Sequence, residues 1–254
     1  MDTSVTPDAA VEVRPSEPSL GLGQRFVAIF TRPAHAWTGL REHPQWWFPL
    51  IVIALFGAGF AAALHHRALL PMMTTAWREQ VANGNMPVET AQHMEEFFGG
   101  PAGLMLSVGQ QFLIMPLIQL LMALLVWFAV GFILGRPLSY RLALEVATWS
   151  GLVSIPGQVL TGLVAWSRET MKGVHIGFGL LLPDTETPSR LMVFLGAVLD
   201  ALGPLSIWYV VVLVLGASAL SGAPRKQVAW VLGGVYFTLV LIFGGLGAMF
   251  TPAS

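Results

Sequence analysis

The chain contains no cysteine, and this absence excludes disulfide bonds, thiolate nucleophiles and zinc sites built from cysteine. Charged residues are also scarce, at 11% of the chain, whereas a soluble domain carries roughly 25%. The net charge is −1, so no positive excess points to a nucleic-acid partner. So few charges cannot solvate the surface of a soluble fold, and we expect most of the outer surface to face lipid.

Recognisable catalytic motifs are lacking too. The sequence has no HExxH helix, no P-loop and no GxSxG elbow, and it lacks the Gly-x-Gly-Asp and Gly-x-Ser-Gly patterns of intramembrane proteases. His65, His66 and His93 have no partner at metal-ligand spacing, and adjacent histidines point in different directions on a helix. We therefore predict a protein that is not an enzyme and that holds no metal or cofactor.

Long apolar runs make up most of the chain, which is 55% hydrophobic with a mean hydropathy of +0.68. Roughly 20 apolar residues in a helix cross the hydrocarbon core. We predict an all-α membrane bundle of about five transmembrane helices, a count that follows from that length. The runs are 46–64, 112–135, 142–166, 201–220 (within 191–220) and 228–250. The third run is the weakest, because it contains Glu145, Pro156 and Gln158.

Basic residues predict the orientation of these spans. The side that includes the N-terminus holds eight Lys and Arg residues and the other side holds five. The short connections 136–141 and 221–227 each hold two basic residues and no acid, whereas the long loops, at about 66–103 and 167–190, together hold seven acids. Because basic loops stay in the cytoplasm, we predict a membrane protein with a cytoplasmic N-terminus and an extracytoplasmic C-terminus.

The segment before the first span is predicted to be amphipathic. Residues 1–20 are polar and proline-rich and predict a disordered cytoplasmic tail. Residues 21–45 place apolar side chains near one helical face and arginines elsewhere, with Pro33 opening a second short helix. Such a segment lies in the membrane interface or packs against the cytoplasmic end of the bundle. The candidates for interfacial anchoring are Phe26, Phe30, Trp37, Trp46 and Trp47.

Three polar residues near the spans are candidate buried functional positions. Glu145 follows Arg141 by four residues, so a local ion pair is possible. Asp200 precedes a Gly203-Pro204 helix break, and we expect backbone N–H groups around 201–205, or a polar side chain of a neighbouring span, to bind its carboxylate. A structural role and a functional role remain open for Glu145 and for Asp200.

Three shorter patterns complete the expectations. Small residues at Ala143, Ala147 and Gly151 predict close helix packing, either within the bundle or in a dimer. The loop after the first span should form two short helices split at Asn83-Gly84-Asn85. The apolar stretch VHIGFGLLL in the loop 167–190 is too short to span, so it should dip into the interface or cover the bundle.

The order of these features resembles a known family. FTRPAHAWTGLREHPQWWFPL (30–50), GRPLSYRLALEVATWSGLVSIPG (135–157) and LDALGPLSIWYVVVLVLGASALSG (199–222) are similar to segments of bacterial Yip1-domain proteins. The resemblance implies a five-helix domain (46–250) with a cytoplasmic N-terminus, and for bacterial members it implies a plasma-membrane protein. Eukaryotic members interact with Rab GTPases, but this chain lacks their Asp-Leu-Tyr-Gly-Pro stretch before the first span. The Rab role is therefore not transferred.

Two functions from different classes fit these features. One is a non-enzymatic scaffold or adaptor that organises a membrane complex, with the lipid bilayer, other membrane proteins or a second copy as partners. The other is a small-solute transporter or channel subunit, or an accessory protein of one. It would need a shared pathway lined by the polar residues of the spans, namely Gln110, Gln111, Gln119, Glu145, Gln158 and Asp200. An intramembrane hydrolase is disfavoured because no nucleophile and base can be named.

The predicted orientation is directly testable with reporter fusions. A fusion at residue 254 should report an extracytoplasmic location, and one in the loop 221–227 should report a cytoplasmic location, because that loop holds two basic residues and no acid. A cytoplasmic C-terminus would contradict the prediction. It would mean an even number of spans or a re-entrant third span.

Overall fold

Residues 19–171, 173–183 and 189–250 are described by a computed structural model. These residues form helices, turns and loops and contain no strand. The prediction of an all-helical protein is therefore confirmed for the part of the chain that is described. Almost all of the predicted tail, 1–20, lies outside these residues.

Among the described residues, four helices are long and apolar enough to cross a membrane. The first is continuous over Trp47–Ala82 and consists of α2 (Trp47–Leu64), the π-helical turn η1 (His65–Leu69) and α3 (Leu70–Ala82). The second, Pro101–Ile133, joins α5 (Pro101–Trp127) to the π-helical turn η2 (Phe128–Ile133). The others are α9 (Pro204–Ser221) and α10 (Arg225–Met249). They match four of the five predicted spans.

The third predicted span is divided into two short helices, α6 (Tyr140–Gly151) and α7 (Ser154–Arg168). Proline cannot donate a backbone hydrogen bond, so Pro156 is accommodated in the first turn of α7 and the helix restarts after Leu152 and Val153. With 12 and 15 residues, the two helices are about 18 and 22 Å long at 1.5 Å per residue. Each is too short to cross alone, and the fifth span stays a prediction.

Helix α6 lies inside the bundle. Every residue from Leu142 to Gly151 is buried, and the helix packs against α2, α5 and α9. Its stripe of small residues lets α5 approach: a methyl group at Gly151 would lie 2.8 Å from the Gln119 carboxamide. The stripe is therefore used for packing within one bundle, and this surface is not free for a dimer.

Two successive helices pack end to end along the last helix of the bundle, α10. α8 (Arg190–Ala201) and α9 both pack against α10, with a break at Leu202 and Gly203 between them. The break lies where Gly203-Pro204 predicted it. The 3-10 turn η3 (Phe178–Leu181) packs against α8, so the apolar stretch of the loop 167–190 covers this end of the bundle.

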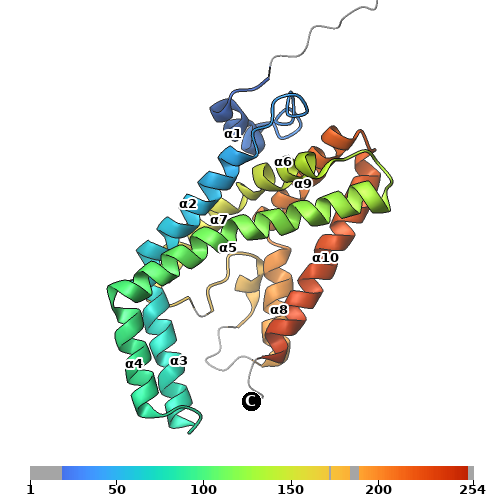
Figure 1. Ribbon diagram of the computed structural model, residues 1–254. Helices are drawn as coiled ribbons and strands as arrows, with labels where there is room; N and C mark the ends of the chain where they lie inside the picture. Colours follow the sequence, from blue (N-terminus) through green and yellow to red (C-terminus); the bar gives the residue numbers. More distant parts are fainter. Residues whose placement is uncertain (1–18, 172, 184–188, 251–254) are drawn as a thin grey trace, which may run out of the picture.

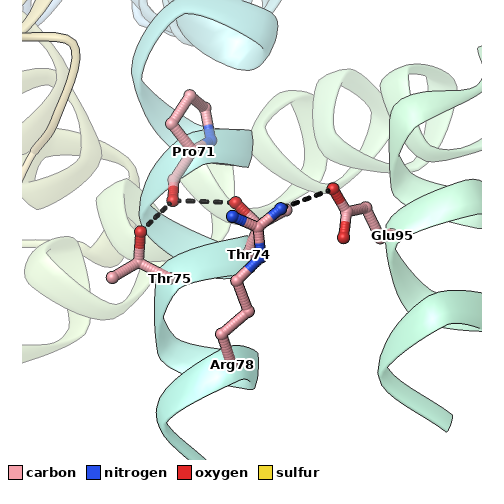
Figure 2. Close-up of polar contacts among 5 residues, drawn as sticks. All are labelled: Pro71, Thr74, Thr75, Arg78 and Glu95. Carbon is pink, nitrogen blue, oxygen red and sulfur yellow. Dashed lines mark hydrogen bonds and ion pairs between the residues drawn. The ribbon is translucent and has the colours of Figure 1, made fainter. Parts of the chain in front are cut away.

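A helical hairpin projects from the bundle (Figure 1). It consists of α3 and α4 (Val88–Gly99), and the turn between them contains Gly84 with a φ of +70°, as the Asn-Gly-Asn signal predicted. The Trp77 and Phe98 rings are 5.6 Å apart between the two helices. Figure 2 shows the ion pair at 3.2 Å that links Arg78 of α3 to Glu95 of α4.

The N-terminal segment contains one helix, α1 (Leu22–Thr31), followed by turns over 33–42. The second short helix expected after Thr31 is absent, so that expectation was wrong. The carbonyl oxygens of Ala36 and Thr38 accept hydrogen bonds from the Arg25 guanidinium. Gly39 adopts a left-handed φ of +77°. Both features stop a helix from propagating through these residues.

Candidate functional site

The N-terminal segment is closed around a buried arginine. The Arg25 side chain is fully buried and uses the fork of donors that a guanidinium provides. It donates to the carbonyls of Leu20 (3.3 Å), Ala36 and Thr38 (3.0 Å) and to the Gln45 carboxamide (2.8 Å). A single side chain thus ties together three separate stretches of the segment.

The same arginine faces the only buried acid of the described residues, Glu145 on α6. Glu145 Oε1 accepts the Gln45 backbone N–H at 2.7 Å, and the Arg25 guanidinium lies 5.7 Å from the centre of the Trp149 ring. Burial lowers the pKa of Arg25 to about 10, and the Glu145 carboxylate opposes that shift. The guanidinium is therefore charged at neutral pH. We call Arg25, Gln45, Glu145 and Trp149 the Arg25 cluster.

The Arg141 side chain does not bind Glu145. The ion pair that the sequence suggested between them does not form among the described residues. The Arg141 guanidinium is at the surface and donates to the Arg41 carbonyl at 2.8 Å. Arg41 in turn donates to the Leu220 carbonyl at the end of α9. Sequence reasoning missed Arg25, although a signal was present: it precedes Ile29 by four residues and so shares its buried face.

The five anchoring candidates separate into two groups. Trp37 is buried, and its ring packs so closely on Gly216 of α9 that a methyl group there would lie 2.6 Å away. It packs inside the protein and does not face lipid, because a glycine leaves room for its ring. The other four are exposed or half-buried: Phe26, Phe30, Trp46 and Trp47. The segment thus packs on the bundle and keeps aromatic side chains at its surface.

A second polar cluster lies at the C-terminal end of α8. Asp200 Oδ2 is 2.6 Å from His175 Nδ1, and Oδ1 accepts the Gly177 backbone N–H at 3.1 Å. The expected backbone donors around 201–205 were wrong: the Leu202 and Gly203 N–H groups donate to backbone carbonyls of α8, and Pro204 has no N–H group. Instead, the Ser206 hydroxyl donates to the Asp200 backbone carbonyl at 3.1 Å. The loop 167–190 supplies both donors to the carboxylate.

Close backbone contacts hold that loop against α8. A methyl group at Gly179 would lie 2.5 Å from Asp200 Oδ1, and one at Gly177 would lie 2.6 Å from the Asp200 Cα. Sequence reasoning missed His175, and its only signal was a histidine among closely spaced glycines. The Asp200 cluster, which we define as His175, Gly177 and Asp200, is partly exposed: the His175 and Asp200 side chains keep 35% and 32% of their surface.

The remaining polar residues of the spans lie apart from the two clusters, and the buried side-chain oxygens of Gln111 and Gln119 have no hydrogen-bond partner among the described residues. Gln119 is buried against Gly151, and Gln158 Nε2 donates to Ser154 Oγ at 3.2 Å. Gln110 is exposed at the surface of α5. Helices α1 and α8 lie at opposite ends of the molecule (Figure 1), so the Arg25 and Asp200 clusters do not share a site.

Comparison with known proteins identifies the relatives of this architecture. The model of the family described as the Yip1 domain matches residues 27–247. A curated protein of Bacillus subtilis (strain 168), described as "Membrane protein YknW", is 24% identical over 225 residues, which cover 86% of this chain and 87% of that protein. No solved structure matches this chain.

The Arg25 cluster predicts a strongly destabilising substitution. Arg25→Met should lower the free energy of unfolding by about 3–5 kcal/mol, because three backbone carbonyls and the Gln45 carboxamide lose their donor and Glu145 loses the positive charge nearby. Arg32→Met is the matched control, since Arg32 is exposed, and it should be nearly neutral. Denaturant titration in detergent measures both variants. Equal effects of the two substitutions would contradict the prediction.

The Asp200 cluster predicts a graded response. Asp200→Asn should be mild, because an acceptor oxygen remains for Gly177 N–H. Asp200→Leu should be worse, at up to about 1–3 kcal/mol, because the partly buried Gly177 N–H then loses its acceptor. Folded yield and limited proteolysis of the loop 167–190 measure both effects. If the Asn variant were fully folded yet inactive in cells, titration of the carboxylate would be required and the structural role would be refuted.

Proposed function

This chain belongs to the Yip1 domain family of membrane proteins, and on that basis we propose that it is a non-enzymatic scaffold or adaptor that organises a complex in the plasma membrane. The observation that carries the proposal is the α3–α4 hairpin, which projects from the bundle (Figure 1). A rigid element outside the bilayer gives a soluble or membrane-bound partner a surface to bind.

Helix length supports an extramembrane position for the hairpin. The continuous helix Trp47–Ala82 has 36 residues, which is about 54 Å at 1.5 Å per residue. The hydrocarbon core is only ~30 Å thick. A helix that enters the core at Trp47 leaves it near Arg67, its first charged residue after a run of apolar ones. All of α3 then lies outside the core, on the extracytoplasmic side if the basic loops are cytoplasmic.

The surface of the hairpin combines charge with exposed apolar side chains. Residues 70–99 contain four glutamates and one arginine, and Val88 and Phe97 keep 54% and 48% of their surface exposed. Interfaces commonly place apolar anchors within a polar rim. The Trp77–Phe98 contact and the Arg78–Glu95 ion pair hold the two helices together, so little entropy is lost when a partner binds.

The separation of the polar residues into different places favours a scaffold over a transporter. A transport pathway needs several polar groups around one solvated space. In the described residues, Gln119 packs on Gly151, Gln158 bonds to Ser154, and Glu145 and Asp200 belong to separate clusters. A structure with a water-filled cavity shared by these groups would favour transport instead.

Affinity purification of the full chain in mild detergent tests the proposal. It should recover a stoichiometric membrane partner or a homo-oligomer. The double substitution Glu89→Lys and Glu96→Lys, on the exposed surface of α4, should reduce that recovery by about tenfold, since like-charge contacts cost an interface more than 1.4 kcal/mol.

The control is Glu42→Lys, which reverses the charge of an exposed glutamate in the N-terminal segment. It should leave partner recovery unchanged. Repeated isolation of the wild-type chain as a bare monomer would contradict the scaffold role. Equal loss of the partner in both variants would place the interface outside the hairpin.

A further inference from the structure

A narrow groove lies where α8 and α9 meet the side of α10. It has a volume of about 230 Å³. The α8–α9 break contributes Ala201, Leu202 and Ile207, and α10 contributes Gly233 and Tyr236. The groove lies at the junction of α8 and α9, opposite Gly233 of α10, which has no side chain to fill it. Apart from the adjoining backbone of α10 itself, no atom of the described residues lies within 4 Å of the position that a Gly233 methyl group would take.

The groove offers almost nothing to a polar ligand. Every lining side chain is apolar except that of Tyr236, and the Tyr236 hydroxyl already donates to the Ala201 carbonyl at 3.0 Å. Apolar cavities of this kind stay dry and take apolar guests. The volume also lies below the roughly 300–1,000 Å³ of pockets for drug-sized ligands, so the groove fits a slender molecule.

The mouth of the groove is continuous with the surface that faces lipid. Leu202, Ile207 and Phe237 line the groove and keep between 41% and 49% of their surface exposed. Both α9 and α10 are apolar enough to span the membrane, so these side chains belong to the surface that meets the hydrocarbon core. The molecules most abundant at that opening are lipid chains.

We propose that the groove between α8, α9 and α10 binds one acyl chain of a membrane phospholipid. Because the groove and the surrounding lipid are both apolar, no hydrophobic driving force moves an acyl chain from bulk lipid into the groove. Binding therefore rests on van der Waals contact with the lining side chains, and the result is a preferred, exchangeable position for a lipid chain. Such a chain would fill the gap at the α8–α9 junction and support the helix that carries Asp200.

Photolabelling of the full-length protein tests this inference. The protein is reconstituted in phosphatidylglycerol and phosphatidylethanolamine with a trace of phospholipid that carries a diazirine midway along one acyl chain. Peptide mapping should find labelling of Ile207, Val211 and Phe237 at least about threefold above that of Leu113 and Leu117, which face lipid on the open surface of α5, because a groove surrounds the chain with more contacts. Equal labelling of the two surfaces would overturn the proposal.

A side chain placed in the groove supplies the matched variant. Gly233→Leu fills open space and should reduce groove labelling to the level of α5. Gly245→Leu, on the same helix about three turns away, also enters open space and should leave groove labelling unchanged. Undiminished groove labelling in a folded Gly233→Leu protein would overturn the proposal, and the comparison with α5 in the wild type decides the question even if that variant fails to fold.

A second copy of the chain is the competing occupant, and the absence of cysteine makes it easy to detect. Phe237→Cys introduces a single thiol at the mouth of the groove. If oxidation in the membrane gave a disulfide-linked dimer in high yield, the groove would be assigned to a protein interface and the lipid proposal would be overturned. A monomeric product together with strong lipid labelling supports it.

Discussion

A buried guanidinium needs acceptors for its N–H donors and a negative charge nearby, and this requirement organises the end of the protein that carries α1. Arg25 satisfies it with three carbonyls, the Gln45 carboxamide and the nearby Glu145 carboxylate. Because Glu145 sits on α6 and α6 is enclosed by α2, α5 and α9, the N-terminal segment is joined to the centre of the bundle. Trp37 reinforces the same contact from the other side by packing on Gly216 of α9.

The features that sequence reasoning predicted well are those dictated by local chemistry. Long apolar runs, the Asn83-Gly84-Asn85 turn and the Gly203-Pro204 break each have a strong local cause, and each has its counterpart in the structure. The third span was harder to predict, because α6 is surrounded by protein. A helix surrounded by protein and one surrounded by lipid are both apolar, so composition alone cannot distinguish them.

The side-chain partners were the least predictable part. Arg141 was an attractive partner for Glu145 because it lies four residues away, yet the positive charge that acts on Glu145 belongs to Arg25, far away in the chain. His175 reaches Asp200 across 25 positions in the same way. Contacts of this kind depend on how helices pack, and neither periodicity nor spacing encodes them. The buried role of Arg25 was nonetheless accessible from its position one turn before Ile29.

The π-helical turn η1 has a geometric consequence for the projecting hairpin. A π turn accommodates an extra residue within a helix that otherwise continues, and in an α-helix each residue turns the chain by about 100°. The five residues His65–Leu69 therefore set the rotation of α3 about the helix axis relative to α2. Loss of a single residue there would leave both helices intact and rotate the outer surface of the hairpin by roughly a quarter turn. The direction in which the hairpin presents Val88 and Phe97 thus depends on the turn η1, which lies at the base of the hairpin and away from those side chains.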